Sequence, residues 1–439
     1  MTKRKKRIIV LGAGMTGLAA GFSSGSPVYE ASEAPGGICS SYYMKPGNAQ
    51  RLSRLPADNQ AYRFEIGGGH WIFGGDQIIL QFMRRFVSLK KYSRRSSVFF
   101  QQKQLFVPYP LQNHLRFLDR DTATRAINEM ARPQGPSSKM KEWLENSFGP
   151  TLCGLFFHPF HRLYTAGLYD QIAPQDAYKS PVDLASVIQG ALNKTPPVGY
   201  NTRFVYPKAG LDELARNIAL HCDINYNREI VEIDPFAKQV IFATGKKIPY
   251  DKIISTLPLN KVVKLAGISD MLETDPHSSV LVLNIGAIKG DRCPKDHWLY
   301  TPDALSGFHR VGFYSNVDPS FLPLVSRKNG DRVSIYVERA YQGGARPSQK
   351  HILKYSDAVI AELQEWGFIK AVEVTDPTWI EVAYTWSWPD SNWKKWALNA
   401  LEKQGIMQVG RYGRWAFHGI ADSIRDGLYV GAAMKPLKE

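Results

Sequence analysis

The stretch from Arg7 to Glu30, RIIVLGAGMTGLAAGFSSGSPVYE, constrains the fold more than any other part of the chain. Four apolar residues run directly into a glycine-rich turn, and a helix-forming run follows. In a dinucleotide-binding unit Gly12 makes the tight turn, Gly14 lets a pyrophosphate approach the backbone, and Gly17 lets the helix pack on the strand. The pattern therefore predicts a Rossmann-type unit, with the free N–H groups of the first helical residues, Met15 and Thr16, facing an anion.

An acidic residue follows this unit at the expected distance. Glu30 lies eighteen positions after Gly12, at the end of a second short strand, where a carboxylate accepts hydrogen bonds from a ribose 2′-OH. This spacing does not separate FAD from NAD. A glycine pair, Gly36 and Gly37, comes next, and such a pair lets a second loop approach a bulky dinucleotide.

Length and charge set wider bounds. The 439 residues suggest two or three domains, and 44% hydrophobic with 22% charged residues is typical of a globular protein. The net charge of +15 favours anionic partners. No nucleic-acid-binding motif is present, so we expect no nucleic acid partner. We interpret most of the basic cluster between Arg84 and Arg95, which includes Arg94, as a solvated surface.

Cysteine usage and hydropathy bear on location. The four cysteines are scattered without a CxxC pair, which argues against a metal site and fits a reducing cytoplasm. The apolar run after the basic start is too short for a signal peptide and ends at Gly12. No stretch reaches the ~18 apolar residues of a membrane span. The sequence predicts a cytoplasmic protein without a membrane partner, and it leaves the oligomeric state open.

Hydrophobic periodicity predicts a helix-rich middle and a strand-rich second half. The expected helices are 76–90, 111–131, 139–148, 180–193 and one that opens at 210. The expected strands are 97–100, 104–107, 204–207, 229–233, 239–242, 250–258, 280–285, 309–314, 333–338 and 378–384. The stretch 410–434 is expected to form a strand, a loop and a helix.

These elements suggest an α/β fold with a Rossmann-type dinucleotide-binding domain, a helical insertion and a mixed β-sheet substrate domain. The expected boundaries are 1–108, 196–260 and 396–439 for the three parts of the dinucleotide-binding domain, which the resemblance given below implies is an FAD-binding domain, 109–195 for the insertion and 261–395 for the substrate domain.

A second glycine-rich turn, Gly67-Gly68-Gly69, precedes His70. Three glycines allow the backbone to lie against a planar ring, and His70 would then stand at the edge of that ring. A glycine-rich turn with a buried histidine is the alternative interpretation.

Several of these motifs resemble known families. The segment from Glu30 to Gly37, EASEAPGG, resembles the FAD-binding start of the superfamily of amine oxidases, protoporphyrinogen oxidases and UDP-galactopyranose mutases. Further segments are similar to the mutases, especially their eukaryotic-type branch. They are GGHWIF (68–73), VPYPLQN (107–113), NTRFVYP (201–207), WLY (298–300) with FHR (308–310), and GRYGRW (410–415).

This resemblance implies roles for residues in those motifs. The implied catalytic residues are His70, beneath the flavin, and Arg310, which would hold the diphosphate. The implied substrate-binding residues are Tyr109, Gln112, His158, Arg162, Asn201, Trp298, Tyr300 and Trp388. The implied cofactor contacts are Gly12, Gly14, Met15, Thr16, Gly17, Glu30, Ala31, Gly36, Gly37, Gly68, Gly69, His70, Ile230, Gly410, Arg411, Asp422 and Ser423.

Two positions depart from the mutase pattern. His158 stands where the mutases have a phosphate-binding arginine, and a histidine lacks the charge at neutral pH and the bidentate fork of a guanidinium. Arg162 lies one helical turn further and is a candidate substitute. Trp388 stands where a tyrosine hydroxyl is expected, and it offers only an indole N–H.

The resemblance implies a flavin-dependent mutase that interconverts the pyranose and furanose forms of a nucleotide-diphosphate hexose similar to UDP-galactose. The reaction would pass through an adduct between reduced flavin N5 and the sugar, with no net redox change. It requires reduced FAD, for which NADPH or NADH is a candidate reductant. One alternative is an FAD-dependent oxidase or desaturase of the amine oxidase or protoporphyrinogen oxidase type, which His158 and Trp388 favour. A flavin-binding scaffold without catalysis is the other.

Overall fold

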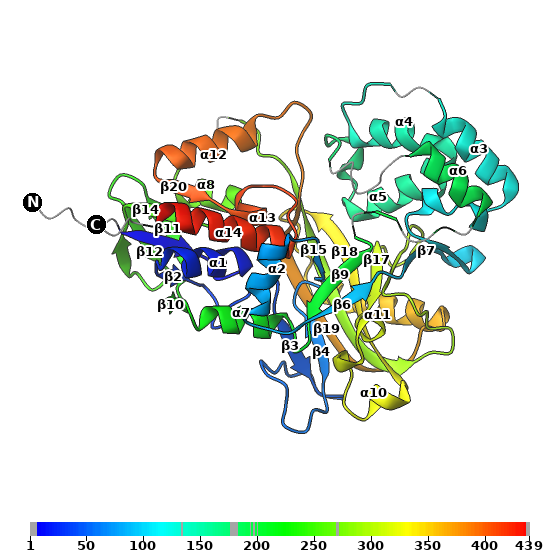
Figure 1. Ribbon diagram of the computed structural model, residues 1–439, viewed down its shortest axis with the longest axis horizontal. Helices are drawn as coiled ribbons and strands as arrows, with labels where there is room; N and C mark the ends of the chain where they lie inside the picture. Colours follow the sequence, from blue (N-terminus) through cyan, green and yellow to red (C-terminus); the bar gives the residue numbers. More distant parts are fainter. Residues whose placement is uncertain are drawn as a thin grey trace, which may run out of the picture.

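Two large β-sheets organise the computed structural model, which describes residues 7–132, 135–175, 183–193, 195, 198–199, 201–268 and 272–435 (Figure 1). The first is a five-stranded parallel sheet. In spatial order its strands are β10 (Ile224–Asn225), β2 (Val28–Tyr29), β1 (Ile8–Leu11), β14 (Lys252–Ser255) and β20 (Ile406–Gln408). The predicted α/β class with a Rossmann-type unit is confirmed.

Both faces of the parallel sheet are covered, as its continuous apolar strands require. Successive residues of β1 point to opposite faces. Ile8 and Val10 pack in one hydrophobic cluster with α1 (Met15–Ser24), α7 (Leu211–Ala219) and α14 (Ile420–Met434). Ile9 and Leu11 pack in another cluster, with α8 (Leu259–Leu265), α12 (Trp393–Lys403) and a three-stranded antiparallel sheet. That sheet contains β11 (Ile230–Asp234), β12 (Gln239–Phe242) and β13 (Lys247–Pro249).

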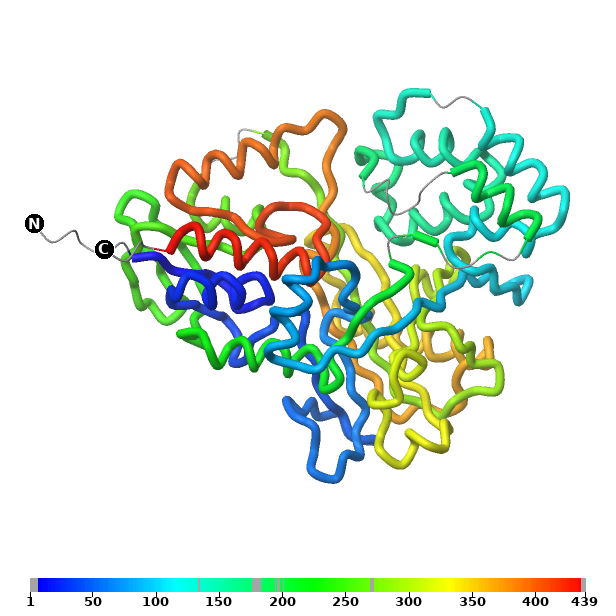
Figure 2. The backbone as a smooth tube through the Cα atoms, in the orientation of Figure 1, coloured from blue at the N-terminus to red at the C-terminus, as the bar shows by residue number. Residues whose placement is uncertain are grey.

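Small residues let α14 lie directly on α1. A Cβ atom at Gly427 would come within 2.2 Å of the Thr16 carbonyl oxygen, and one at Gly431 within 2.1 Å of the Ser23 hydroxyl. The glycines of the segment DGLYVGAA thus permit a close helix contact. This contact places the C-terminal helix beside the first helix of the chain, as Figure 2 shows.

The second large sheet is mixed and has seven strands. In spatial order they are β19 (Ile369–Thr385), β15 (His277–Lys289), β18 (Arg332–Gln342), β17 (Arg310–Phe313), β16 (Trp298–Tyr300), β7 (Ser96–Phe100) and β8 (Leu105–Pro108). The β7–β16 pair is parallel and the other pairs are antiparallel. The strands predicted between residues 280 and 384 fall within this sheet. The predicted hairpin of β7 and β8 forms too, but it extends this sheet.

Helix α11 (Gln349–Glu365) covers one face of the seven-stranded sheet, where its buried residues share a cluster with Leu281, Leu283 and Ile285 of β15. Smaller elements complete the body. They are β3 (Ser41–Met44) with β4 (Tyr62–Glu65), β5 (Ile72–Phe73) with β9 (Arg203–Pro207) and β6 (Leu89–Ser93), and the helices α2 (Gln77–Arg84), α9 (Tyr314–Val317), α10 (Ser326–Asn329) and α13 (Gly410–Gly413).

Four helices form a separate lobe with its own core, at the upper right of Figure 1. They are α3 (Arg120–Met130), α4 (Met140–Leu152), α5 (His158–Tyr164) and α6 (Leu184–Leu192). A π-helical turn at Cys153–Phe157 joins α4 to α5. The start of the predicted helix 180–193 lies outside the described residues.

Several predicted helix and strand boundaries were wrong. The expected helix 111–131 is two 3₁₀ turns, Leu111–Asn113 and Leu115–Phe117, before α3 begins. Leu118 is extended, and the Asp119 side chain accepts a hydrogen bond from the Thr122 N–H, which starts a new helix. The expected helix 76–90 ends at Arg84, because the next residues form β6 and pair with β9. Residues 410–413 form a helical turn, and the strand lies earlier, at β20.

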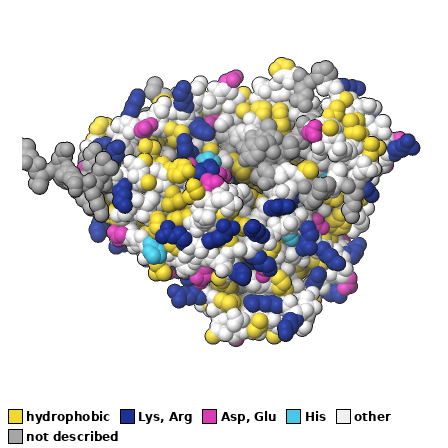
Figure 3. Space-filling view, in the orientation of Figure 1, with side chains coloured by type: hydrophobic (Ala, Val, Ile, Leu, Met, Phe, Trp, Pro, Cys, Tyr) yellow, Lys and Arg dark blue, Asp and Glu magenta, His cyan; other side chains and the backbone are white. Residues whose placement is uncertain are grey.

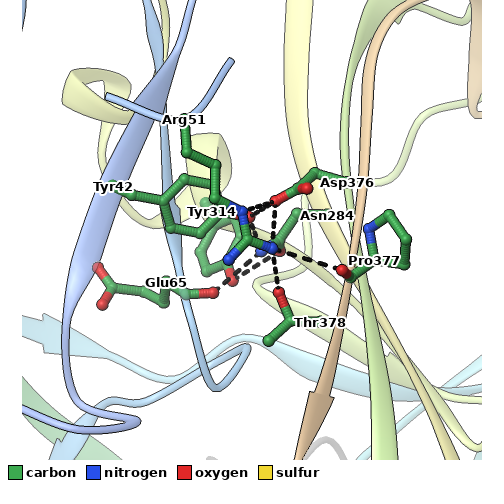
Figure 4. Close-up of polar contacts among 8 residues, drawn as sticks. All are labelled: Tyr42, Arg51, Glu65, Asn284, Tyr314, Asp376, Pro377 and Thr378. Carbon is green, nitrogen blue, oxygen red and sulfur yellow. Dashed lines mark hydrogen bonds and ion pairs between the residues drawn. The ribbon is translucent and has the colours of Figure 1, made fainter. Parts of the chain in front are cut away.

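A buried polar network joins β3 and β4 to the seven-stranded sheet (Figure 4). Asn284 on β15 is fully buried, and its Nδ2 donates to the Tyr42 hydroxyl at 2.9 Å and to the Glu65 carbonyl oxygen at 3.0 Å. The Tyr314 hydroxyl donates to Asn284 Oδ1 at 3.1 Å. Both ends of the amide are therefore satisfied, as a buried amide requires.

The ring of Phe99 on β7 packs against other aromatic rings near the edge of the large sheet, and its removal measures how much this packing stabilises the fold. It is fully buried, with ring centroids of Phe106 and Trp366 at 4.5 and 5.0 Å. We expect Phe99→Ala to lower the free energy of unfolding by about 3–5 kcal/mol, because it opens a cavity. The control Phe236→Ala removes a ring that is 92% exposed and should cost less than about 0.5 kcal/mol. Urea titration of both variants measures the difference, and equal losses would contradict this account.

Candidate active site

A cavity of about 620 Å³ lies between the parallel sheet, the seven-stranded sheet and the helical lobe. Segments far apart in sequence contribute to its lining: the first glycine turn, the second glycine turn, β16 to β18, the α5 segment and the start of α14. The predicted site residues that line it are Gly12, Gly14, Met15, Thr16, Glu30, Gly36, Gly37, Gly69, His70, Tyr109, Asn201, Trp298, Tyr300, Arg310, Arg411, Asp422 and Ser423.

The first glycine turn forms one end of the cavity. Gly12 has a φ of +92°, which a residue with a side chain rarely adopts. Gly14 caps α1 with extended backbone, and a Cβ atom there would meet no protein atom within 4 Å. A Cβ atom at Gly17 would come within 1.8 Å of the Gly12 carbonyl oxygen, so this glycine serves the packing of helix on turn. Gly12 and Gly17 therefore have the turn and packing geometry expected of them, and Gly14 borders open space.

Glu30 closes the same end. Its carboxylate accepts hydrogen bonds from the backbone N–H groups of Ala13 at 2.6 Å and Ser32 at 2.9 Å. These bonds fix the carboxylate beside the glycine turn, at the edge of the cavity. Its position is compatible with a bond to a ribose hydroxyl.

His70 projects from the second glycine turn. Its backbone N–H donates to the Gly68 carbonyl oxygen at 2.8 Å, and its buried Nδ1 has no hydrogen-bond partner in the described part of the chain. Burial lowers the pKa of His70 to about 4, and the positive charges of Arg411 and Arg310 act in the same direction against Glu338. The imidazole is therefore neutral at pH 7.

Arg310 on β17 faces Glu338 on β18 across the sheet. Its Nε lies 3.0 Å and its Nη2 2.5 Å from Glu338 Oε2. Burial alone would raise the pKa of Glu338, but Arg310 and His309 outweigh burial and lower this pKa to about 2. Burial would lower the pKa of Arg310, yet the charge of Glu338 prevails and raises it. The pair is ionised, so Glu338 neutralises the arginine that the sequence assigns to a diphosphate.

Two other basic groups line the cavity near this pair. The guanidinium of Arg411 donates to the carbonyl oxygens of His418 at 3.1 Å and Ala383 at 3.0 Å, and it lies 4.5 Å from the centre of the Phe417 ring. Burial lowers the pKa of His309, whose Nε2 lies 3.6 Å from Glu338. The described lining holds two cations, Arg310 and Arg411, and three acids, Glu30, Glu338 and Asp422. The cavity therefore carries no excess of positive charge, although the chain as a whole is strongly basic.

Aromatic rings form much of the wall opposite the glycine turn. The rings of Tyr109 and Tyr300 lie 4.6 Å apart, and Phe160 meets Tyr300 edge-on at 5.4 Å. Tyr164 contacts Tyr384 at 4.7 Å. These rings join the helical lobe to the seven-stranded sheet.

The sequence analysis missed Arg94, which it placed in a solvated basic surface. The side chain is 2% exposed. It donates to Asn201 Oδ1 and, through Nη2, to the carbonyl oxygens of Tyr109 at 2.9 Å and Val198 at 2.8 Å. Arg94 therefore positions two predicted substrate-binding residues from different motifs. Arg94 lies within a strongly basic run, and nothing in the sequence distinguished it from the exposed basic residues beside it.

Other predicted residues lie outside the lining. His158 Nε2 faces Glu145 Oε1 at 3.1 Å, and Trp388 donates from its indole to the Thr274 carbonyl oxygen at 3.1 Å. Gln112 is 1% exposed, and Arg162 is exposed. From the α5 segment, His161 and Tyr164 line the cavity in their place. Of the predicted cofactor contacts, Gly17, Ala31, Gly68, Ile230 and Gly410 also lie outside it.

Neither a metal centre nor a membrane span is found in the described part of the chain. Its His, Cys, Asp and Glu residues form no group of three or more that could hold a metal ion. Its helices include none with both the length and the apolar character needed to cross a bilayer.

Comparison of the chain with known proteins identifies a family that it matches. Residues 27–277, more than half of the chain, match the family described as flavin containing amine oxidoreductase. Three solved structures are similar over nearly the whole chain. A reduced UDP-galactopyranose mutase is 22% identical, with 97% of this chain and 95% of that chain covered and a TM-score of 0.83.

The other two structures have different activities in their names. A CLA-producing fatty acid isomerase from P. acnes is 14% identical, with coverages of 99% and 100% and a TM-score of 0.61. A putrescine oxidase bound to putrescine is 15% identical, with 98% of both chains covered and a TM-score of 0.57. At these identities the likeness establishes the fold that all of them share.

The residues at the glycine end of the cavity fit a flavin dinucleotide. The open space at Gly14, the N-terminus of α1 and the carboxylate of Glu30 suit a pyrophosphate and a ribose. The unpartnered Nδ1 of His70 would face the ring system from the second glycine turn.

Gly14→Ala tests this fit. The added methyl group meets no protein atom but occupies the space next to the helix N-terminus. We therefore expect an intact fold and a flavin affinity that falls about tenfold. Gly154→Ala is the control, because its Cβ atom also meets nothing within 4 Å but lies away from the cavity. Fluorescence titration of flavin into both stripped variants measures the change. Equal affinities would contradict the assignment.

The lowered pKa of His70 predicts a dependence of stability on pH. Below pH 6.5 the imidazole of His70 is protonated in the unfolded chain but stays neutral in the folded protein, where its pKa is about 4. The free energy of unfolding therefore falls as the pH falls from 6.5 to 4. At ~1.4 kcal/mol per pH unit, His70 accounts for about 2 kcal/mol between pH 6.5 and 5. Between pH 7 and 5, the free energy of unfolding of flavin-free His70→Asn, measured by urea titration, should fall by about 2 kcal/mol less than that of flavin-free wild type. An equal fall in the free energy of unfolding of both proteins would show that folding does not keep His70 neutral.

Proposed function

We propose that this chain, which belongs to the family of flavin containing amine oxidoreductases, interconverts the pyranose and furanose forms of a nucleotide-diphosphate hexose similar to UDP-galactose. The observation that carries the proposal is a single cavity that runs from the glycine turn at Gly14 to polar groups around Asn201 and Arg310. In this proposal the flavin lies at the glycine end and the diphosphate sugar at the other. The structural likeness to a UDP-galactopyranose mutase supports the same assignment.

The chain's own groups would bind the diphosphate mainly through hydrogen bonds. Since Arg94 occupies the amide oxygen of Asn201, the group that Asn201 offers is its Nδ2 donor. The phenols of Tyr109 and Tyr300 line the cavity beside it and can also donate. Glu338 occupies Nε and Nη2 of Arg310, which leaves Nη1 for a phosphate oxygen.

Stabilisation of the leaving diphosphate would then depend on directed donors more than on net charge. A donor aimed at developing charge in a water-excluded site stabilises the transition state strongly. Aromatic rings border these donors, and the ion pair with Glu338 fixes the guanidinium plane of Arg310.

The flavin would supply the nucleophile. When it is bound as reduced FAD, its ring offers a nucleophilic nitrogen to the anomeric carbon of the sugar. His70, neutral and held by the second glycine turn, would orient the ring without adding a positive charge to it. NADPH or NADH is the proposed source of the electrons.

A second candidate is an FAD-dependent oxidase with a mostly apolar substrate, and the pairing of Arg310 with Glu338 favours it. A cavity in which Arg310 is neutralised and burial lowers the pKa of His70 and His309 offers less to a diphosphate than the sequence motifs suggest. The aromatic wall suits an apolar substrate equally well. The structural likeness to a putrescine oxidase is compatible with this activity.

Reduction state separates the two candidates. We would reduce FAD-loaded protein with dithionite under anaerobic conditions, add UDP-galactopyranose and related nucleotide hexoses, and follow furanose formation by chromatography. The mutase predicts conversion by the reduced protein, none by the oxidised protein and no peroxide. Peroxide from the oxidised protein with an amine or an apolar substrate, without any conversion of the sugars, would contradict the mutase and support the oxidase.

Arg310→Gln examines the diphosphate site directly. Loss of one positioned donor should lower kcat/KM for the nucleotide sugar by about a hundredfold. Arg339→Gln is the matched control, because Arg339 lies next to Glu338 on β18 and donates to the Ser306 carbonyl oxygen outside the cavity. An unchanged kcat/KM in Arg310→Gln would show that the diphosphate binds elsewhere.

A further inference from the structure

A second cavity, of about 790 Å³, lies along α7. We call it the α7 groove. It is formed by α7 and the residues just after it, by β3, β4 and the loop between them, and by the segment 320–327. Among the described residues its lining shares no member with that of the candidate active site. Nothing in the proposed reaction uses this groove.

Positive charge is in excess in the α7 groove. Five basic side chains line it, and one of them, Arg216, is paired with Asp212 at 3.2 Å. The other four are Arg54, Arg63, Lys208 and Arg327. Glu213 is then the one remaining acid in the described lining. In Figure 3, Lys and Arg side chains gather on the lower middle of the face, over the region of α7 and β6.

Arg63 is the buried centre of this charge. The residue is 4% exposed, yet it forms no ion pair within 4 Å with a described acid. Its Nη1 and Nη2 donate to the Lys208 carbonyl oxygen at 3.3 Å and to the Ser320 hydroxyl at 2.9 Å, and its buried Nε has no partner. Glu65 and Asp212 act on it only at longer range. A buried guanidinium without a paired anion is costly, so an anion in the groove would stabilise it.

The neighbouring arginine responds to this charge. Burial lowers the pKa of Arg327, and the positive charge of Arg63 lowers it further. Its Nε donates to the Leu322 carbonyl oxygen at 3.0 Å. Two guanidinium groups and Lys208 therefore meet at the end of the groove near the N-terminus of α7, which is a geometry suited to phosphate oxygens.

The opposite end of the groove is apolar. Leu220, which caps the C-terminus of α7, is 82% exposed, and Cys222 and Ile224 line the groove just after it. Tyr226 follows β10 and lies further along the groove, near Arg216. The nine residues of α7 separate the two ends by ~14 Å. Exposed apolar side chains beside a tyrosine ring can hold a planar group.

We propose that the α7 groove binds a nucleoside diphosphate as a second ligand, separate from the substrate of the candidate active site. The phosphates lie at Arg63, Lys208 and Arg327, and the base lies against Leu220 and Tyr226. Arg54, midway along the groove, neutralises further phosphate charge.

The test uses the full-length, FAD-loaded protein, with ADP as the probe in equilibrium dialysis and 8-azido-ADP for crosslinking. The double variant Arg54→Gln/Arg327→Gln removes two cations from the groove and should weaken ADP binding at least about tenfold for each. Lys91→Gln/Arg203→Gln is the control, since it removes the same charge from exposed positions outside both cavities. It should leave ADP binding within about twofold of wild type, since screening weakens the effect of distant exposed charges.

The base end has its own measurement. Tyr226→Ala should weaken ADP binding about tenfold and leave pyrophosphate binding unchanged. Photolysis of bound 8-azido-ADP should label the segment 220–226. Three results would each overturn the proposal: equal affinity in the double variant and its control, labelling of the candidate active site in place of α7, or pyrophosphate binding as tight as that of ADP.

Discussion

The amide of Asn284 connects the two halves of this protein, and the candidate active site depends on it. A buried asparagine in an apolar strand is tolerated only when both ends of its amide are bonded. Here one end holds Tyr42 and the backbone of Glu65, and the other accepts the hydroxyl of Tyr314 (Figure 4). Glu65 is the last residue of β4 before the second glycine turn. The network therefore fixes where that turn, and with it His70, stands against the seven-stranded sheet.

The electrostatics of the cavity follow from the same burial. A basic chain would be expected to form a strongly cationic site for a diphosphate. Burial instead keeps His70 and His309 neutral, and Glu338 balances Arg310. Binding there rests on directed donors and on aromatic walls. Excess positive charge is found in the α7 groove, where Arg63 lies buried without a paired acid.

Local motifs predicted much of the site because each is read from contiguous residues. The turn at Gly12, the carboxylate of Glu30 and the turn before His70 lie together at the cavity as expected. Helix ends were less predictable. Leu111 to Ala131 has apolar residues at helical spacing, but the extended backbone at Leu118 and the cap at Asp119 divide it. The strand β6 was missed because the adjacent Lys90 and Lys91 interrupt the apolar alternation typical of a strand, and pairing with β9 supplies its stability.

The sequence by itself determined the dinucleotide-binding unit, most strands of the large sheet and the glycine turns at the cavity. Glycine conformation and apolar alternation are local properties, so they can be read without neighbours. Only the tertiary structure decided which charges remain available. Arg94 is buried against Asn201, Arg310 is neutralised by Glu338, and His158 faces Glu145. Each of these partners lies on another segment, and the energy of a charge depends on the groups that surround it after folding.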